Sequence, residues 1–351
     1  MEGKMLEMFE VGPCEDGFQL GFLTGQRFRN QIRSRLAGDH IFQSQLLPFA
    51  QTPQAQQLIK ALSETNQNMF PRYWAELLGI AEGSAVPIIL INFRKELVPF
   101  ISNTEINSNA NTADDCSDVL IVSDSMAVAA HNEDAVSGLI GNTYLIKVKL
   151  SNGLSFTAYT YAGELPTCAF GFNSQGVAFT QNSVLPIEGD IVPGGIGRSF
   201  VSRDLLEATS IADALAKRMV LNVETASRLR VSVHEVGSTP FFHANMYLHL
   251  QVQQVHDESS VRRQKRAAVL PQGSKADVLS VLRDTEDPKE PIYSTGPHRY
   301  TLCTTFIDLD EKTLTIFEGH PKKGNISYVF SMSSNDFNCK LVNSEDQRTR
   351  L

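Results

Sequence analysis

Apolar residues at helical spacing dominate the first third of the chain. Four segments show this pattern: Phe18 to Leu36, Pro53 to Leu62, Arg72 to Glu82 and Pro87 to Ile101. Apolar positions three and four residues apart line one face of a helix. Pro53 stands where the first turn of a helix tolerates proline, and Gly83 is a residue type that commonly follows a last turn. This part of the chain is therefore predicted to be mainly helical.

A polar segment separates these helices from a block of predicted strands. Residues 103–115 are rich in asparagine and poor in apolar residues, which is typical of an exposed loop. Short runs of β-branched and aromatic residues follow. They comprise Val119 to Val122, Met126 to His131, Thr143 to Leu150 and Leu154 to Tyr161. The pairs Asp124-Ser125 and Asn152-Gly153 lie between them and predict hairpin turns.

The remainder of the chain mixes both kinds of element. Strands are predicted at Thr167 to Phe172 and Val177 to Gln181, and helices at Ser199 to Thr209, Ile211 to Met219 and Lys275 to Arg283. Phe241 to Gln251 alternates only weakly, whereas Tyr300 to Asp308 and Leu314 to Glu318 form a predicted closing hairpin. Helices, then antiparallel strands, then helices again predict an α+β layered domain and not a doubly wound parallel sheet.

Composition and charge fit a folded protein and argue against a nucleic-acid partner. The 351 residues allow two domains or one large two-layer domain, and hydrophobic residues make up 42%. The formal net charge is -8, whereas nucleic-acid binding relies on clustered basic residues. The densest basic stretch lies among polar residues, so we expect a solvated loop there, with an anion site as the alternative. It comprises Arg262, Arg263, Lys265 and Arg266.

The two ends of the chain and its cysteines bear on its location. Residues 1–11 contain three glutamates and no long apolar run, so no secretory signal is expected. No window approaches the roughly 18 apolar residues of a membrane span, and five cysteines without a CxxC pair favour a reducing compartment. We predict a cytoplasmic protein without a membrane partner. Thr349-Arg350-Leu351 loosely resembles a peroxisomal address, which leaves a peroxisomal location as the alternative.

Cys116 stands where the predicted loop ends and a strand begins. A peptide bond there is accessible, while the strand holds the side chain one residue further on. If the thiol attacks the carbonyl of Asp115, an N-to-S acyl shift and hydrolysis leave Cys116 with a free α-amino group. An ordinary α-amino group has a pKa of about 7.7 to 8.0, so it can take the thiol's proton and return it to a leaving amine. A lone cysteine is, however, more often an inert buried residue.

An ordered series of motifs, interrupted by one gap, resembles the acyl-coenzyme A:isopenicillin N acyltransferase family. The series runs through Gly17-Phe-Gln-Leu-Gly21 with Gly25, Phe70 to Glu76, Gly79 to Gly83, Ile91 to Glu96, Asp114-Asp-Cys-Ser117, His131-Asn-Glu-Asp134 and Gly171 to Val177. Asp114 to Ser117 stands at the position of the family's self-cleavage site. The family belongs to the N-terminal-nucleophile hydrolases and includes β-alanyl-dopamine hydrolase. The resemblance covers most of the chain, so it is more specific than any single motif.

The resemblance implies an αββα sandwich, with two antiparallel sheets between helical layers, and a set of site residues. Cys116 matches the nucleophile, and Asp134, which follows 18 residues later (134 minus 116), matches the carboxylate that orients the nucleophile or its amino group. Asn245 resembles the amide that helps to hold the developing oxyanion. Weaker candidates for contacts with substrate or oxyanion are Asn132, His298 and Arg299. His131 and His243 are expected to serve packing or hydrogen bonding.

The chain departs from the family pattern in two places. Asp115 precedes the nucleophile, where the family commonly has glycine. Between Ala226 and His234 the family has about two further strands, which this chain is expected to lack. Losing central strands would leave sheet edges and apolar surface unpaired.

These features predict a self-processing amidohydrolase or acyltransferase with an N-terminal cysteine nucleophile. Cleavage between Asp115 and Cys116 would give a helical chain, 1–115, and a nucleophile-bearing chain, 116–351, that stay associated. The first choice of reaction is hydrolysis of a small N-acyl or peptide-like amide through an acyl-thioester on Cys116. No metal and no cofactor is expected. An acyl-coenzyme A-dependent N-acyltransferase and a catalytically silent protein with a binding or regulatory role are the alternatives.

Overall fold

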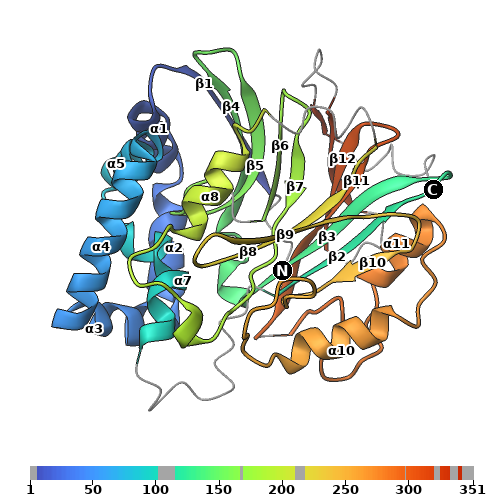
Figure 1. The fold of residues 1–351 in the computed structure, drawn as a ribbon. Helices are drawn as coiled ribbons and strands as arrows, with labels where there is room; N and C mark the ends of the chain where they lie inside the picture. The colour runs from blue at the N-terminus through green and yellow to red at the C-terminus, as the bar shows by residue number, and fades with distance from the viewer. Residues whose placement is uncertain are drawn as a thin grey trace. The chain divides into compact units, whose positions relative to one another are not determined.

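The computed structural model describes residues 6–101, 115–166, 169–209, 218–296, 298–319, 325–332 and 339–341. The chain divides into two compact units, of which the first comprises residues 1–110, 138–173 and 191–208 and the second 111–137, 174–190 and 209–351. Each unit combines helices with a β-sheet (Figure 1), so the predicted α+β class is confirmed. Both units draw on residues from either side of the predicted cleavage point, so neither unit coincides with a cleavage fragment.

Most helices of the first unit lie at predicted segments, whereas η1 and α3, at residues 42–50, were not predicted. The longer ones are α1 (Gly17–Arg27), α2 (Arg29–Gly38), α4 (Pro53–Met69), α5 (Pro71–Ser84) and α8 (Arg198–Leu205). The shorter ones are η1 (Phe42–Leu46), α3 (Leu47–Ala50), α6 (Ile89–Asn92), α7 (Arg94–Leu97) and η2 (Val98–Phe100). The side chains of Asp16 and Thr52 cap α1 and α4 because they accept hydrogen bonds from free backbone N–H groups of the first turn.

Glycines allow α1 and α5 to approach each other closely. A Cβ atom on Gly21 would lie 1.9 Å from the carbonyl oxygen of Glu76, and one on Gly79 would lie 2.2 Å from that of Phe18. Both distances are far below van der Waals contact, so only glycine fits at these two positions without a shift of backbone. The glycine motif that opens the family resemblance therefore serves helix packing.

The sheet of the first unit contains β1 (Glu7–Cys14), β4 (Thr143–Leu150), β5 (Ser155–Tyr161) and β6 (Phe170–Asn173), in that order. β1 runs parallel to β4, and the other neighbours are antiparallel. Phe28, between α1 and α2, stacks on Tyr144 and meets Phe9 edge-on, which joins the helices to the sheet. β1 escaped prediction because it is a half-exposed edge strand without a continuous apolar run.

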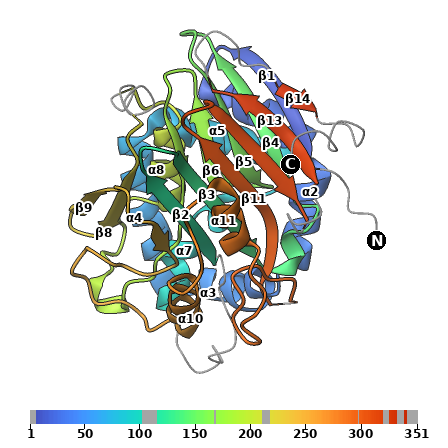
Figure 2. The same ribbon diagram turned by 90° about the vertical axis from the view of Figure 1, so that its right-hand side faces the viewer.

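The sheet of the second unit has seven strands within the part of the chain that the structure describes. Their order is β10 (Phe241–His243), β2 (Cys116–Val122), β3 (Ala127–Ala135), β11 (Tyr300–Asp308), β12 (Thr313–Glu318), β13 (Ile326–Ser331) and β14 (Cys339–Leu341). All neighbours are antiparallel, and Figure 2 shows β2, β3 and β11 side by side. The predicted hairpins at Asp124-Ser125 and between β11 and β12 are confirmed.

Two helices of the second unit, α10 (Glu258–Ala267) and α11 (Lys275–Leu282), share a buried core with β2 and β3. Val278 and Leu282 contribute to it from α11, and Val119 and Val128 from the strands. The second unit thus packs helices against its sheet. α10 also shows that the expected solvated loop at 262–266 is wrong. The stretch is helical and Arg263 is 0% exposed, which hydropathy alone does not indicate for a basic residue.

A separate hairpin occupies the region around residues 226–234, where the chain was expected to lack about two strands. β8 (Leu221–Ala226) and β9 (Arg230–Glu235) pair only with each other among the described residues, and neither was predicted. Val223, Val231 and Val233 are 51%, 56% and 61% exposed. This hairpin therefore carries apolar surface that no described residue covers. The weak alternation from 241 to 251 yields only the three residues of β10.

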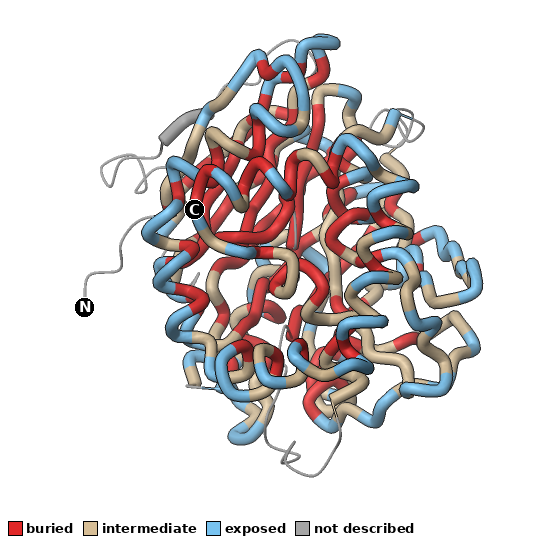
Figure 3. The backbone as a smooth tube through the Cα atoms, turned by 90° about the vertical axis from the view of Figure 1, so that its left-hand side faces the viewer, coloured by how far each residue is buried: buried red, intermediate tan, exposed pale blue. Residues whose placement is uncertain are grey.

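Buried residues concentrate on the strands, while the helices alternate between buried and exposed faces (Figure 3). Cys14, Cys116 and Cys303 are buried free thiols. No helix of the described residues is both long enough and apolar enough to cross a bilayer.

Several predictions lie outside the described residues: the loop 103–114, all but the end of the helix 211–219, the start of the strand at Thr167, and Thr349 to Leu351. β7 (Ala178–Thr180) and η4 (Glu188–Asp190) complete the second unit, and η3 (Ser137–Leu139) precedes β4.

Candidate active site around Cys116

Cys116 is the first residue of β2, and it is 2% exposed. Its backbone is held on both sides. The amide N–H donates to Oδ1 of Asn245 at 2.8 Å, and the carbonyl oxygen accepts from Nη1 of Arg263 at 2.5 Å. The nitrogen of the peptide bond that is predicted to break is therefore fixed in place. Asp115 and Cys116 are both buried, so the expectation that this bond is accessible is wrong.

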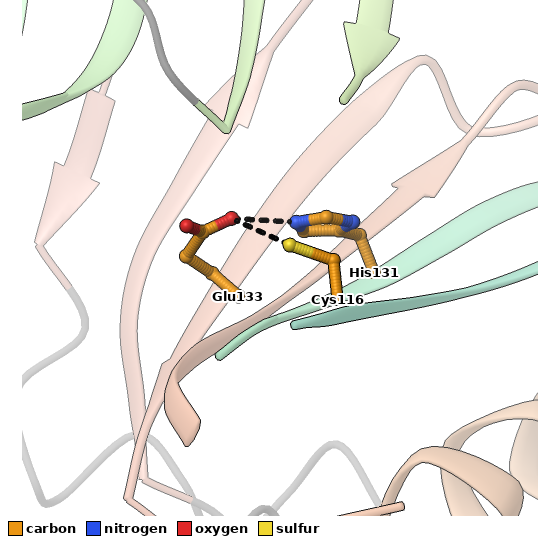
Figure 4. A group of neighbouring side chains, drawn as sticks. All are labelled: Cys116, His131 and Glu133. Atoms are coloured by element: carbon orange, nitrogen blue, oxygen red, sulfur yellow. Dashed lines mark hydrogen bonds and ion pairs between the residues drawn. The ribbon is translucent and has the colours of Figure 1, made fainter. Parts of the chain in front are cut away.

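The thiol of Cys116 faces a chain of buried polar side chains. The β2–β3 ladder sets Cys116 opposite Glu133 and Asp118 opposite His131, so all four side chains leave the same face of the sheet. Sγ lies 3.5 Å from Oε2 of Glu133. Nε2 of His131 lies 2.9 Å from the same oxygen (Figure 4). Nδ1 of His131 lies 2.8 Å from Oδ1 of Asp118.

The charges of Asp118, His131 and Glu133 stabilise one another. Burial lowers the pKa of His131, but the negative charges and hydrogen bonds of Asp118 and Glu133 outweigh it and raise that pKa to about 10. His131 is therefore an imidazolium at neutral pH, and both ring nitrogens donate to carboxylates. The sequence prediction of a hydrogen-bonding role for His131 agrees with this geometry.

Cys116, His131 and Glu133 are also residue types that can bind a metal. The ligand-type atoms of Cys116, His131 and Glu133 all lie within 4.8 Å of one another. A metal needs the lone pair of a neutral imidazole and must displace a proton to reach it. Metal binding here would therefore have to displace a proton that the two carboxylates favour on His131.

Asp134 and Asn132 point to the opposite face of β3 from the thiol, since successive residues of a strand alternate between faces. Asn132 donates to the carbonyl oxygens of Leu282 and Ile292 at 2.8 and 3.3 Å, which gives it a structural role. Asp134 is fully buried. Burial raises its pKa to about 6, although Arg299 and Arg263 act against this rise. Asp134 thus belongs to the group of charges around Asp115 and does not contact Sγ from its own face.

The Asp115 carboxylate is held by buried donors. Its Oδ2 lies 3.3 Å from Oγ of Ser259, 3.4 Å from Nη1 of Arg299 and 3.8 Å from Nη2 of Arg263. Arg299 is 5% exposed, whereas its neighbour His298 is exposed. Of the two late basic candidates, the structure brings Arg299 to the site and leaves His298 outside it.

Asn245 binds the main chain of Cys116 through its oxygen. Oδ1 accepts from the N–H of Cys116 and from Nη2 of Arg263, and Nδ2 donates to the carbonyl oxygen of Ser183 at 2.9 Å. An oxyanion needs a donor, so the predicted oxyanion role would require Nδ2 to exchange its partner. That role stays a prediction.

His243 on β10 is the direct cross-strand partner of Asp118 on β2. Its Nδ1 is 3.1 Å from Nδ2 of Asn182, and its Nε2 is 3.5 Å from Oε1 of Glu224. The side chain is buried and makes hydrogen bonds, as expected from the sequence.

Sequence reasoning missed Glu133, Asp118 and Arg263 as site residues. A usable signal existed for the first two: alternation on adjacent strands places them on the Cys116 face once the turn at Asp124-Ser125 sets the register. Arg263 gave no such signal, because it contacts Cys116 from 147 residues further along the chain.

Comparison with known proteins places the chain among amide hydrolases and acyltransferases. A family model described as acyl-coenzyme A:6-aminopenicillanic acid acyl-transferase matches residues 122–218, a stretch that begins after Cys116 and includes Glu133 and Asp134. The chain is 22% identical to the β-alanyl-dopamine/carcinine hydrolase of Drosophila melanogaster over 358 residues, which is 87% of this chain and 91% of the relative.

Two more distant similarities complete the comparison. The 40 kDa form of the acyl-coenzyme A:6-aminopenicillanic-acid-acyltransferase of Emericella nidulans is 27% identical over 165 residues, 46% of this chain and 43% of that protein. A crystal structure of a mutant conjugated bile acid hydrolase from Clostridium perfringens aligns with a TM-score of 0.34 and 13% identity, over 66% of this chain and 97% of the other. The family model and the two relatives by sequence confirm the resemblance predicted from the motifs.

Proposed function

This chain is a relative of the acyl-coenzyme A:6-aminopenicillanic acid acyl-transferase family, and from that premise we propose that it is a self-processing amidohydrolase. Cleavage before Cys116 frees its amino group. The thiol then takes the acyl group of a small N-acyl or peptide-like amide. The relatives support the general class, since one is named as a hydrolase and the other as an acyltransferase.

The observation that carries the proposal is that buried side chains hold both sides of the bond between Asp115 and Cys116. Asn245 holds the nitrogen of Cys116, and Arg299 with Ser259 holds the side chain of Asp115. Holding the reacting groups in one geometry lowers the entropy cost of reaching the transition state. The Asp115 side chain thus has a place in the site, although the family commonly has glycine there.

The chemistry after processing needs only the new N-terminus and water. The α-amine of Cys116 accepts the thiol proton, and Sγ attacks the substrate carbonyl. The C–N bond breaks, the leaving amine takes the proton, and an acyl-thioester remains on Sγ. Water then hydrolyses the thioester and restores the thiol. Asp134 is proposed to orient the amine, and Asn245 to donate to the oxyanion after its amide exchanges partners.

A second candidate reaction is transfer of an acyl group from an acyl-coenzyme A to an amine. The description of the matching family model names acyl-coenzyme A, which favours this candidate. Both reactions share the acyl-thioester on Cys116. They differ in the donor of the acyl group and in its acceptor.

The test is an activity screen of the purified, full-length protein. N-acyl amines are supplied alone, and acyl-coenzyme A compounds are supplied with and without amines. We expect hydrolysis of at least one N-acyl amine and a loss of at least about 10⁴-fold in Cys116→Ala. Cys14→Ala removes another buried thiol and serves as the matched control.

The screen also separates the alternatives. Thioester consumption that requires an amine would favour the transferase. A wild-type chain that stays unbroken and turns over no substrate of either kind would contradict the proposal and favour a silent binding protein.

A further inference from the structure

Before the peptide bond breaks, Cys116 has no free amine that could act as the base for self-cleavage. Before the cut, the nitrogen of Cys116 is a peptide amide whose lone pair is delocalised into the carbonyl, so it cannot accept the thiol's proton. The free amine exists only after the bond has broken. Another group must therefore deprotonate Sγ in the first step.

We propose that Glu133 is the general base of self-cleavage and that His131 and Asp118 position it. The inference rests on the proposed function and concerns the step that precedes turnover. Oε2 of Glu133 is 3.5 Å from Sγ, and the same oxygen receives the hydrogen bond from Nε2 of His131 (Figure 4). Glu133 touches the reacting atom and is the catalytic residue, whereas His131 and Asp118 act through it.

The strand register explains why this carboxylate is aimed at the sulfur. Cys116 and Glu133 are direct cross-strand partners, so their side chains emerge together from one face. Two residues before Glu133 on the same strand, His131 lies on the same face and is braced by Asp118 from β2. Rotation of Glu133 away from Sγ would break its bond to His131. The base is therefore preorganised.

Burial and charge make the arrangement chemically useful. Glu133 is 1% exposed and His131 is 0% exposed, so water does not compete for the carboxylate. The charged groups that face His131 are Asp118 on β2 and Glu133 on β3, while its neighbour on β11 is the uncharged Thr305. The imidazolium offsets the cost of burying two carboxylates, and its positive charge favours the thiolate as the thiol proton leaves.

The step balances in atoms and protons. The Sγ proton passes to Oε2 of Glu133 while Sγ bonds to the carbonyl carbon of Asp115. The tetrahedral intermediate then collapses, the C–N bond breaks, and the nitrogen of Cys116 takes the proton back from Glu133. Water hydrolyses the resulting thioester, which leaves a carboxylate on Asp115 and a thiol and amine on Cys116. From then on the amine serves as the base for turnover.

The first test follows self-cleavage of the newly synthesised full-length chain by intact mass. Glu133→Gln keeps the shape of the side chain and removes its basicity, so we expect cleavage to slow by about 10²- to 10⁴-fold. The rate of the variant should then rise about tenfold per pH unit up to the usual thiol pKa of about 8.5, because only the thiolate reacts. The wild-type rate should be nearly flat over the same range near neutrality. Cys14→Ala, which removes a buried thiol on β1 of the first unit, is the control.

His131→Gln tests the positioning role. We expect slower cleavage that retains the flat pH profile of the wild type, because Glu133 is still present but is less well aimed. If His131 were merely structural, His131→Gln would cleave more slowly, but its pH profile would not differ from that of Glu133→Gln.

A second arm isolates the step from folding. Residues 1–115 and 116–351 are co-expressed, the second segment behind an initiator methionine that methionine aminopeptidase removes before cysteine, so that the cut before Cys116 is supplied without self-cleavage. After this cut, Glu133→Gln should lose at least tenfold less in substrate turnover than it loses in self-cleavage. An equal loss in both, or self-cleavage of Glu133→Gln at the wild-type rate and pH profile, would overturn the inference. Failure of the wild type to cleave or turn over in either arm would contradict the proposed function instead.

Discussion

The helix pair α1–α5 and the strand pair β2–β3 both lie in the motifs that carry the family resemblance, yet they perform opposite physical tasks. The helix pair is joined by glycines and by backbone contact, with Gly21 directly against Glu76. The strand pair buries Cys116, His131 and Glu133, which are reactive or titratable. A motif match thus indicates that residues matter, and the structure shows whether they serve packing or chemistry.

The two pairs also differ in how they are stabilised. Close helix packing gains dispersion energy and tolerates no added atom. Buried charges cost free energy unless each finds a partner. Beside Cys116, the side chains of Asp118, His131 and Glu133 partner one another. Substitutions in the helix pair should therefore act on stability, and those near the strand pair on processing as well.

Among the substitutions that test this comparison, Arg263→Met should have the largest effect on stability and self-cleavage. Arg263 is fully buried and donates to the carbonyl of Cys116, to Ser117 and to Asn245. Its loss leaves buried acceptors unpaired and frees the backbone of the nucleophile, so we expect unfolding to become easier by about 3–5 kcal/mol and self-cleavage to slow. Urea unfolding and intact mass measure the two effects.

Arg262→Met is the matched control for that prediction. Arg262 lies on the same helix and pairs with Asp287, but its side chain is 31% exposed. An exposed pair contributes about 1 kcal/mol or less. Equal losses in the two variants would show that the burial of Arg263 is not what matters.

A smaller effect is expected in the helix pair. Gly21→Ala places a methyl group on a backbone oxygen, so α1 and α5 must separate, at a cost of about 1–3 kcal/mol in unfolding free energy. The chain that does fold should still cleave itself. Gly38→Ala, with no atom within 4 Å of its added Cβ, should be neutral or slightly stabilising. Loss of cleavage in folded Gly21→Ala would contradict the separation of the two tasks.

Stability should also depend on pH through His131. Its pKa in the folded protein is about 10, above the usual 6.5, so its stabilising contribution is complete below pH 6.5 and is lost as the pH rises towards 10. The difference in unfolding free energy between wild type and His131→Gln should therefore shrink over this window. A constant difference from pH 6.5 to 10 would show that His131 is not held as the cation.

Much of the fold could be predicted because local pattern decides it. The β2–β3 hairpin follows from alternation and from the turn at Asp124-Ser125, and α4 and α5 follow from apolar spacing. The place of Cys116 at the start of a strand is as predicted, whereas its role as nucleophile rests on the family resemblance and stays a prediction. Arg263 could not, because hydropathy assigns a basic cluster to solvent and the partners of Arg263 come from distant segments.

The central claim is that Cys116 acquires its amine by cutting the bond that precedes it. Intact-mass analysis of the wild-type and Cys116→Ala proteins under denaturing conditions tests it most directly. We expect two wild-type fragments that meet between Asp115 and Cys116, with cysteine as the new N-terminus, and a single unbroken chain for Cys116→Ala. An unbroken wild-type chain, a cut elsewhere, or the same cut in Cys116→Ala would contradict the claim.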